Sequence, residues 1–216
     1  MRKLLLFAGV ILCLSGCVSV NADIAVKPNG SGVLALEYRV PESLDGLGKL
    51  DGNEMYPTIP VGKTDFERSI KRIEGLSLVS FSEKAEKRDP SYGAYMVTTV
   101  KLKFLTLDAL VRFLSATGQR AVYSFKNGIN RLSLVVWEKW EENEKIDSDL
   151  LDLAAAVSEG CHFSLRFSVP QNAAQIRLVD VDGQDVDIGV IRADRVTIPM
   201  PALIVEKNGV RLEILW

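Results

Sequence analysis

The sequence predicts an α+β fold, a mainly antiparallel sheet of hairpins with about three amphipathic helices packed on one face. Short runs of alternating apolar and polar residues recur along the chain, turn-forming residues join several of them in pairs, and a few longer stretches repeat apolar residues at helical spacing. Because a hairpin pairs neighbouring strands, the sheet is expected to be antiparallel. The 216 residues are 47% hydrophobic and 25% charged. That composition excludes a disordered chain and a multi-spanning membrane protein.

Period-two alternation marks the strands, and it is clearest from Cys161 to Val169. Asn127-Gly128 predicts a tight hairpin turn, and a phase change between Leu78 and Val79 predicts a bulge. Residues 84–91 are expected to form a charged hairpin tip. About ten strands are expected, and the segments with strand character are residues 23–26, 34–40, 76–83, 100–104, 121–125, 132–136, 161–169, 175–181, 186–191, 196–205 and 210–216.

Three stretches carry the apolar spacing of amphipathic helices. The first is expected to begin with a capping box, in which Thr64 is the N-cap and Glu67 follows three residues later, and to end at Gly75. Thr106 is the expected cap of the second helix. The third covers residues 150–157. Residues 41–62, rich in Gly and Pro, are expected to form a long loop.

The N-terminus has the form of an export signal. Two basic residues precede an apolar run from Leu4 to Leu14, which is shorter than the ~20 residues that span a bilayer. Leu14-Ser15-Gly16-Cys17 resembles the bacterial lipobox, in which cleavage precedes the cysteine and its sulfur receives a diacylglyceryl group. We therefore expect a signal peptide over residues 1–16, a lipidated tether over 17–22 and a single extracytoplasmic domain over 23–216. The alternative is an ordinary signal peptide in which Cys17 has no special role.

Lipidation at Cys17 would place the protein in the cell envelope, anchored by palmitate or a similar acyl chain on the extracytoplasmic side. Val18 and Ser19 follow Cys17 instead of the Asp that often retains lipoproteins at an inner membrane, so the outer membrane is expected if the cell has two. Loss of residues 1–16 removes two basic residues and no acid, which changes the net charge from −2 to −4. No nucleic-acid partner is expected, because such a partner needs a basic face.

The cysteines and the single histidine offer little material for catalysis. Cys13 is lost with the signal and Cys17 is modified, which leaves Cys161 as the one unmodified thiol, so we expect no intramolecular disulfide. Cys161 and His162 are neighbours on a strand, and their side chains are therefore expected to point to opposite faces instead of forming a thiol–imidazole pair.

One acidic segment is a candidate for a cation. Residues 180–187 contain four aspartates, and calcium takes several such oxygens. The spacing does not match an EF-hand loop, and we favour a hairpin turn centred on Asp182-Gly183. Nucleophile-elbow, P-loop and zinc-protease motifs are absent from the sequence. We therefore expect no enzyme activity, no cofactor and no metal.

Four features of the sequence occur together in one known family. They are the lipobox at Cys17, a first strand Asp23-Ile24-Ala25-Val26 that runs directly into the turn at 28–32, a long alternating strand that reaches Val169-Pro170, and a closing segment over 212–216. In these features the chain resembles the bacterial lipoproteins typified by the mycobacterial LppM-like domain. The resemblance implies an extracytoplasmic α+β domain, with lipid or glycolipid binding suggested for a relative, and it carries over no catalytic residue. Members often continue into a C-terminal transmembrane helix; this chain stops at Trp216, so no second anchor is expected.

Two functions follow as hypotheses. The first is a membrane-anchored, non-enzymatic binding module that holds lipid or another apolar ligand between its sheet and helices. The second is a structural or assembly lipoprotein that binds another cell-envelope protein through the 41–62 loop or an exposed sheet edge. The sequence names no ligand-binding residue for either.

Overall fold

The computed structural model describes residues 19–41, 63–87, 94–116, 120–140, 148–169 and 174–216. These residues form eleven strands and four helices, and most strand pairs are antiparallel, so the predicted α+β class is confirmed. In chain order the elements are β1 (Ser19–Val26), β2 (Gly32–Pro41), α3 (Lys63–Lys71), β3 (Leu76–Lys87), β4 (Ala94–Phe104), α4 (Leu107–Ala116), β5 (Ala121–Lys126), β6 (Ile129–Trp137), α5 (Ser148–Val157), β7 (His162–Ser168), β8 (Gln175–Val179), β9 (Val190–Arg192), β10 (Arg195–Pro199), α6 (Met200–Val205) and β11 (Val210–Leu215).

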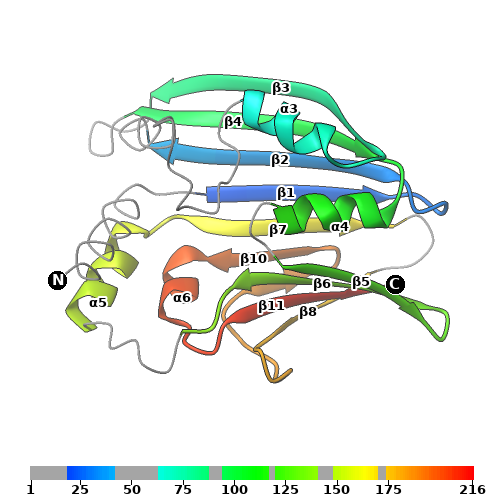
Figure 1. Ribbon diagram of the computed structural model, residues 1–216. Helices are drawn as coiled ribbons and strands as arrows, with labels where there is room; N and C mark the ends of the chain where they lie inside the picture. The colour runs from blue at the N-terminus through cyan, green and yellow to red at the C-terminus, as the bar shows by residue number, and fades with distance from the viewer. Residues whose placement is uncertain (1–18, 42–62, 88–93, 117–119, 141–147, 170–173) are drawn as a thin grey trace.

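The strands form two sheets, whereas the sequence pattern led us to expect one. Seven lie in the order β3-β4-β2-β1-β7-β10-β9 and four in the order β5-β6-β11-β8 (Figure 1). β1 pairs with β2 as the predicted hairpin and with β7 in parallel, from Val20 beside Phe163 to Ala25 beside Ser168. This parallel pair joins segments about 140 residues apart, and alternation within one strand carries no information about such a partner.

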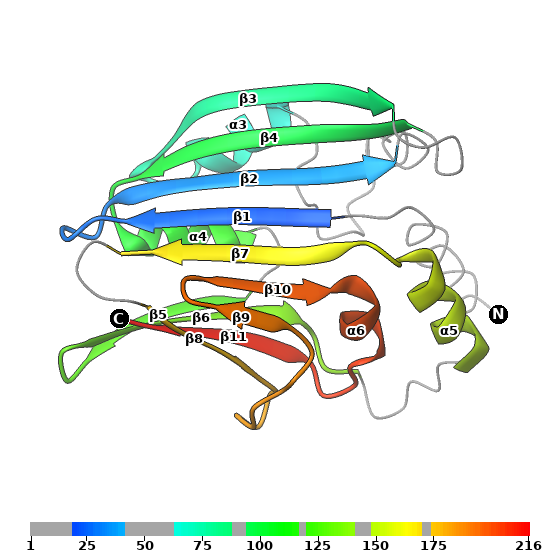
Figure 2. The ribbon, with the colours of Figure 1, turned by 180° about the vertical axis from the view of Figure 1, so that it is seen from behind.

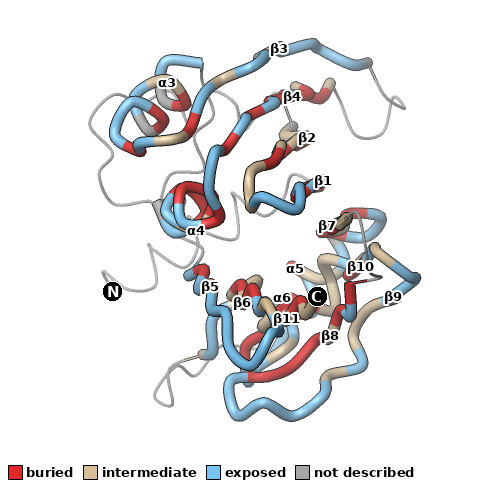
Figure 3. Tube along the Cα trace, turned by 90° about the vertical axis from the view of Figure 1, so that its right-hand side faces the viewer, coloured by how far each residue is buried: buried red, intermediate tan, exposed pale blue. Residues whose placement is uncertain are grey.

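Helices α3 and α4 and the smaller sheet cover the same face of the larger sheet. α3 and α4 lie over its β3–β4–β2–β1 half, and the four-stranded sheet covers the half that contains β7 and β10 (Figures 1 and 3). The opposite face of the larger sheet is turned to the viewer in Figure 2, and no described element lies over it. The sequence pattern predicted helices on one face of the sheet, and it did not predict the second sheet that shares this face with them.

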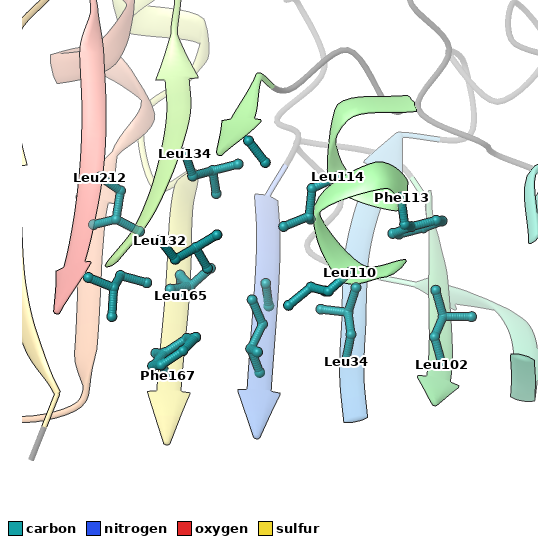
Figure 4. Packing of buried hydrophobic residues seen from close by; sticks show 14 of the residues in the cluster. Leu34, Leu102, Leu110, Phe113, Leu114, Leu132, Leu134, Leu165, Phe167 and Leu212 are labelled. Atoms are coloured by element: carbon teal, nitrogen blue, oxygen red, sulfur yellow. The ribbon is translucent and has the colours of Figure 1, made fainter. Parts of the chain in front are cut away.

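The core lies in the layer between these elements. Leu34 of β2 and Leu102 of β4 lie below Leu110 and Phe113 of α4 (Figure 4). All four side chains are completely or almost completely buried. The ring of Phe66 in α3 also stacks on that of Phe113, with centroids 6.4 Å apart.

The second half of the core joins the two sheets. Leu132 and Leu134 of β6 point toward Leu165 and Phe167 of β7 (Figure 4). Burial of one such side chain contributes about 1.5–3 kcal/mol, so the core can hold the two sheets together.

Several local predictions are confirmed. Asn127 and Gly128 connect β5 to β6 with φ angles of 53° and 79°, as a tight hairpin turn requires. The register of β3 against β4 shifts between Leu78 and Ser80, which is the predicted bulge. Thr106 caps α4, because its Oγ1 accepts the backbone N–H of Ala109 at 3.2 Å.

Other boundaries differ from the prediction. β1 begins at Ser19, so residues 19–22 are part of the sheet and not of the predicted tether. α3 begins at Lys63, one residue before the predicted cap Thr64. Residues 200–205, expected as strand, form α6, because Pro201 suits the first turn of a helix and has no N–H to give to a sheet. Residues 186–189, expected as strand, lie outside β9.

Two further points concern the membrane and the long loop. Within the described residues, no helix combines the length and apolar character that a bilayer crossing needs. The predicted loop over 41–62 lies outside the described residues, apart from Pro41 at the end of β2.

Candidate ligand-binding cleft

A cleft opens at the end of the molecule where several distant segments of the chain meet. The β1–β2 turn, the start of α4, the β5–β6 hairpin and the chain's last residue all lie at this end (Figures 1 and 2). The cleft has a volume of about 430 Å³. Small-ligand sites typically have ~300–1,000 Å³. Its lining consists of Val26, Lys27, Pro28, Asn29, Gly30, Leu107, Tyr123, Gly128, Asn130, Val169 and Trp216.

Two aromatic rings form one wall of the cleft. Tyr123 of β5 and Trp216, which follows β11, are stacked with centroids 6.2 Å apart and planes inclined by 28°. Trp216 also packs on the fully buried Phe167 of β7 at 4.9 Å. The wall is therefore backed by the core, and an apolar or aromatic group could lie against it without the rings having to rearrange.

Asn130 of β6 bonds to the hydroxyl of Tyr123 and to the backbone of Trp216. Its Oδ1 accepts the hydroxyl proton of Tyr123 at 2.7 Å, and its Nδ2 donates to the carbonyl oxygen of Trp216 at 3.4 Å. The backbones of Asn130 and Trp216 also exchange two hydrogen bonds, of 2.9 and 3.1 Å. The side chain of Asn130 thus links β5 to Trp216. Because the hydroxyl of Tyr123 has a hydrogen-bond partner, it can line the cleft without the energetic cost of an unsatisfied polar group.

The opposite wall is the β1–β2 turn. Asn29 holds this turn, because its Oδ1 accepts the backbone N–H and the hydroxyl of Ser31 at 3.1 and 2.8 Å. Gly30 has a φ of 78°, a conformation that favours glycine. The exposed Lys27 brings a positive charge to the lining. The cleft therefore offers both an apolar wall and polar or charged groups to a molecule that enters it.

Sequence reasoning did not find this cleft. Its lining comes from six separate parts of the chain, and only their strand and turn character could be read in advance. In the sequence, Tyr123 has the pattern of an inward-facing strand residue, and Trp216 is the last residue of a predicted strand. No motif connects them, because β5 and the chain end become neighbours only through β6.

Cys161 lies directly before β7, and His162 is the first residue of that strand. Cys161 is 2% exposed, and its sulfur is in a disulfide bond, so the expectation of an unmodified thiol is wrong. Nε2 of His162 lies 3.2 Å from Oδ1 of Asn21, and the backbone N–H of His162 donates to Oγ of Ser19 at 3.4 Å. The other cysteines, Cys13 and Cys17, lie outside the described residues, and so does the predicted lipidation site.

The acidic segment over 180–187 begins with the predicted turn. Oδ1 of Asp180 accepts the backbone N–H groups of Asp182 and Gln184, both at 2.9 Å, and Gly183 has a φ of 83°. Asp185 forms an ion pair of 2.8 Å with Arg177. The turn thus holds the carboxylate of Asp180, and Arg177 holds that of Asp185. Across the described part of the chain, no three His, Cys, Asp or Glu side chains gather into a group that could hold a metal ion.

One ion pair on the uncovered face of the larger sheet changes the titration of its members. Nε of Arg166 donates to Oδ2 of Asp194 at 2.7 Å. That hydrogen bond lowers the pKa of Asp194 below its ordinary value of 3.8 and raises the pKa of Arg166. The pair joins β7 to the residue before β10, and it lies away from the cleft lining.

No family model matches the chain, and no curated protein matches it either. Among solved structures, the chain is similar to the folded domain of the LppM protein of Mycobacterium tuberculosis, determined by NMR, with 11% identity and a TM-score of 0.43 over 93% of this chain and 90% of that one. A TM-score below 0.5 does not establish a common fold, so the resemblance to the LppM-like family stays a prediction.

Proposed function

We propose that this chain is a membrane-anchored extracytoplasmic lipoprotein that acts as a non-enzymatic binding module for lipid or another apolar ligand. The cleft is the observation that carries the proposal. It combines apolar side chains of Val26, Leu107 and Val169 with the stacked rings of Tyr123 and Trp216. Ligand sites typically combine apolar and aromatic side chains with a few placed polar groups, and this cleft contains both kinds.

The polar groups of the cleft suggest how a ligand would be oriented. An acyl chain or ring would lie against Tyr123 and Trp216, where each square ångström of apolar surface removed from water contributes about 25 cal/mol. A polar or anionic head would lie near Lys27 and Asn29. The ligand class that fits this arrangement is an amphipathic molecule with a single apolar part.

Uptake of cis-parinaric acid, a fluorescent fatty acid, tests the cleft. The purified full chain is expected to bind it, and Val169→Trp, which fills the cleft, is expected to weaken binding about tenfold or more. Val205→Trp is the matched control, because Val205 is 47% exposed on α6 and does not line the cleft. Absence of uptake by the natural chain, or equal binding by the two variants, would refute a ligand site here.

The lipid anchor needs a separate test, because one sulfur cannot carry both a thioether and a disulfide. The mass of the N-terminal peptide of the mature protein is expected to show Cys17 with a diacylglyceryl group, and labelled palmitate is expected on the chain. Disulfide mapping without reduction identifies the partner of Cys161. A Cys17–Cys161 cross-linked peptide in the mature protein, or unchanged membrane fractionation of Cys17→Ser, would refute the anchor.

A second candidate function is the binding of another envelope protein. The observation in its favour is β3, a twelve-residue strand at the edge of the larger sheet whose Val79 is 55% exposed. An open edge can accept a strand from a partner. The four charged residues of the same strand, Glu83, Lys84, Glu86 and Lys87, oppose such pairing. Reproducible cross-linking of one envelope protein to β3 would favour this function over ligand binding.

A further inference from the structure

The tip of the β5–β6 hairpin exposes large apolar side chains. Phe125 is 65% exposed and Ile129 52%, on either side of the Asn127-Gly128 turn. Val122, further back on β5, is 62% exposed. The hairpin lies at the end of the molecule that holds the cleft, and its tip extends outward there (Figures 1 and 2).

The strand register places these side chains on both faces of the hairpin. Phe125 pairs with Asn130 and lies on the face that continues through Tyr123 and Leu132 into the core. Ile129 pairs with Lys126 on the other face. The tip therefore carries one large exposed apolar side chain on each face, and Ile129 lies on the face that does not continue into the core.

The charge of the hairpin has a single sign. Residues 121–137 contain Lys126 and Arg131 and no acidic residue, in a chain whose net charge is −2. Lys27, in the neighbouring β1–β2 turn, adds a third cation at the same end. Glu213, the acid nearest in register, stands opposite Ser133 and away from the tip.

We propose that this tip docks on an anionic lipid bilayer, with Phe125 and Ile129 inserted at the interface and Lys126 and Arg131 facing the headgroups. Aromatic and aliphatic side chains beside lysine and arginine are the combination that binds such interfaces. A protein partner would also cover apolar side chains, but the surplus of positive charge favours an anionic surface.

Docking at this tip would bring the mouth of the cleft to the bilayer, because Gly128 and Asn130 of the same hairpin line the cleft. The eight residues of β1 span about 25 Å between the N-terminal side and this end. A chain anchored near Ser19 would therefore lie along the bilayer and touch it at both ends. The docking itself does not require a ligand in the cleft.

Quenching by brominated lipid tests the docking in the full chain. Phe125→Trp adds a reporter at the tip, and Leu153→Trp, on the 52% exposed Leu153 of α5 at the other end, is the matched control. The vesicles contain phosphatidylcholine with about a third phosphatidylglycerol. We expect brominated lipid to quench the fluorescence added by the Phe125→Trp substitution and not the fluorescence added by the Leu153→Trp substitution. Changing Lys126 or Arg131 to Gln in the reporter background is expected to weaken docking about fivefold for each charge.

The outcomes separate this inference from its alternatives. Equal quenching of the two reporters would refute it, and so would quenching that is unaffected by loss of both charges. A blue shift of Phe125→Trp that depends on protein concentration without lipid would assign the tip to a second copy of the chain instead. Uptake of cis-parinaric acid together with an unquenched tip would refute the docking alone, whereas a quenched tip without uptake would refute the ligand site alone.

Discussion

Substitution of Gly32 by Ala should destabilise the protein far more than a methyl group normally does. Gly32 is buried at the start of β2, where it pairs with Val26 on one side and with Phe104 on the other. An added Cβ would lie 2.8 Å from Cε2 of Phe104, and closer still to its Cζ and to the carbonyl oxygen of Ala25. Because one obstacle is backbone, rotation of a side chain cannot relieve the contact.

The size of the stability loss caused by Gly32→Ala follows from the kind of atom that must move. Overpacking of a core costs about 1–3 kcal/mol, and displacement of the β1 backbone places Gly32→Ala at the upper end. For a protein of this size, that loss corresponds to a fall in Tm of about 6–12 °C. The displaced strand leads into the turn that forms one wall of the cleft, so cis-parinaric acid binding should weaken as well.

Gly30→Ala provides the matched control two residues earlier. A Cβ at Gly30 would meet no atom within 4 Å, and the remaining cost is that of a non-glycine residue at a φ of 78°. That cost is about 1–2 kcal/mol. Thermal unfolding followed by circular dichroism measures both variants. An equal Tm for the two would show that the close packing of Gly32 does not exist in solution, and a Tm of Gly32→Ala like that of the natural chain would refute the reasoning outright.

Three further changes test other parts of the structure. Thr106→Ala should lower the stability by about 1 kcal/mol through loss of the α4 cap, and Thr106→Ser should restore most of it, in urea unfolding. Asp180→Ala should cost about 1–3 kcal/mol, because two N–H groups of the turn lose their acceptor, and calorimetric titration of the natural chain with calcium should give no heat. Arg166→Gln should raise the pKa of Asp194 toward 3.8 in an NMR titration. In the natural chain, the lowered pKa of Asp194 stabilises the fold at pH values above the pKa that Asp194 has in the unfolded chain. This stabilisation is lost as the pH falls through the pKa of Asp194 in the folded protein.

Controls for these changes lie in the same chain. Arg112 forms an exposed ion pair with Asp108 within α4, and Arg112→Gln should leave the titration of Asp194 unchanged. Asp180→Asn keeps an acceptor oxygen and should cost less than Asp180→Ala. An equal loss for Asp180→Asn and Asp180→Ala would show that the two N–H bonds do not hold the turn. Heat released on addition of calcium would revive the cation site.

Local features of the fold could be predicted from the sequence because neighbouring residues decide them. Asn127-Gly128 tolerates the positive φ angles of its turn, and Thr106 offers a hydroxyl to the first turn of α4. The bulge at Val79 was visible as a break in alternation. Where two local signals competed, the prediction failed: the apolar residues 200–205 suited a strand, but Pro201 favours the first turn of a helix.

The candidate site and the sheet arrangement depended on contacts between distant segments. Residue pattern alone determined the α+β class, the hairpins and most helices, since each depends on residues a few positions apart, and the same kind of local pattern predicts the export signal with its lipobox. Only the tertiary structure decided that β7 lies parallel to β1, that a second sheet covers half of the first, and that Tyr123, Asn130 and Trp216 meet in one cleft. The physical reason is that an apolar strand face specifies burial but not its partner, and the partner is selected by how all the faces pack together.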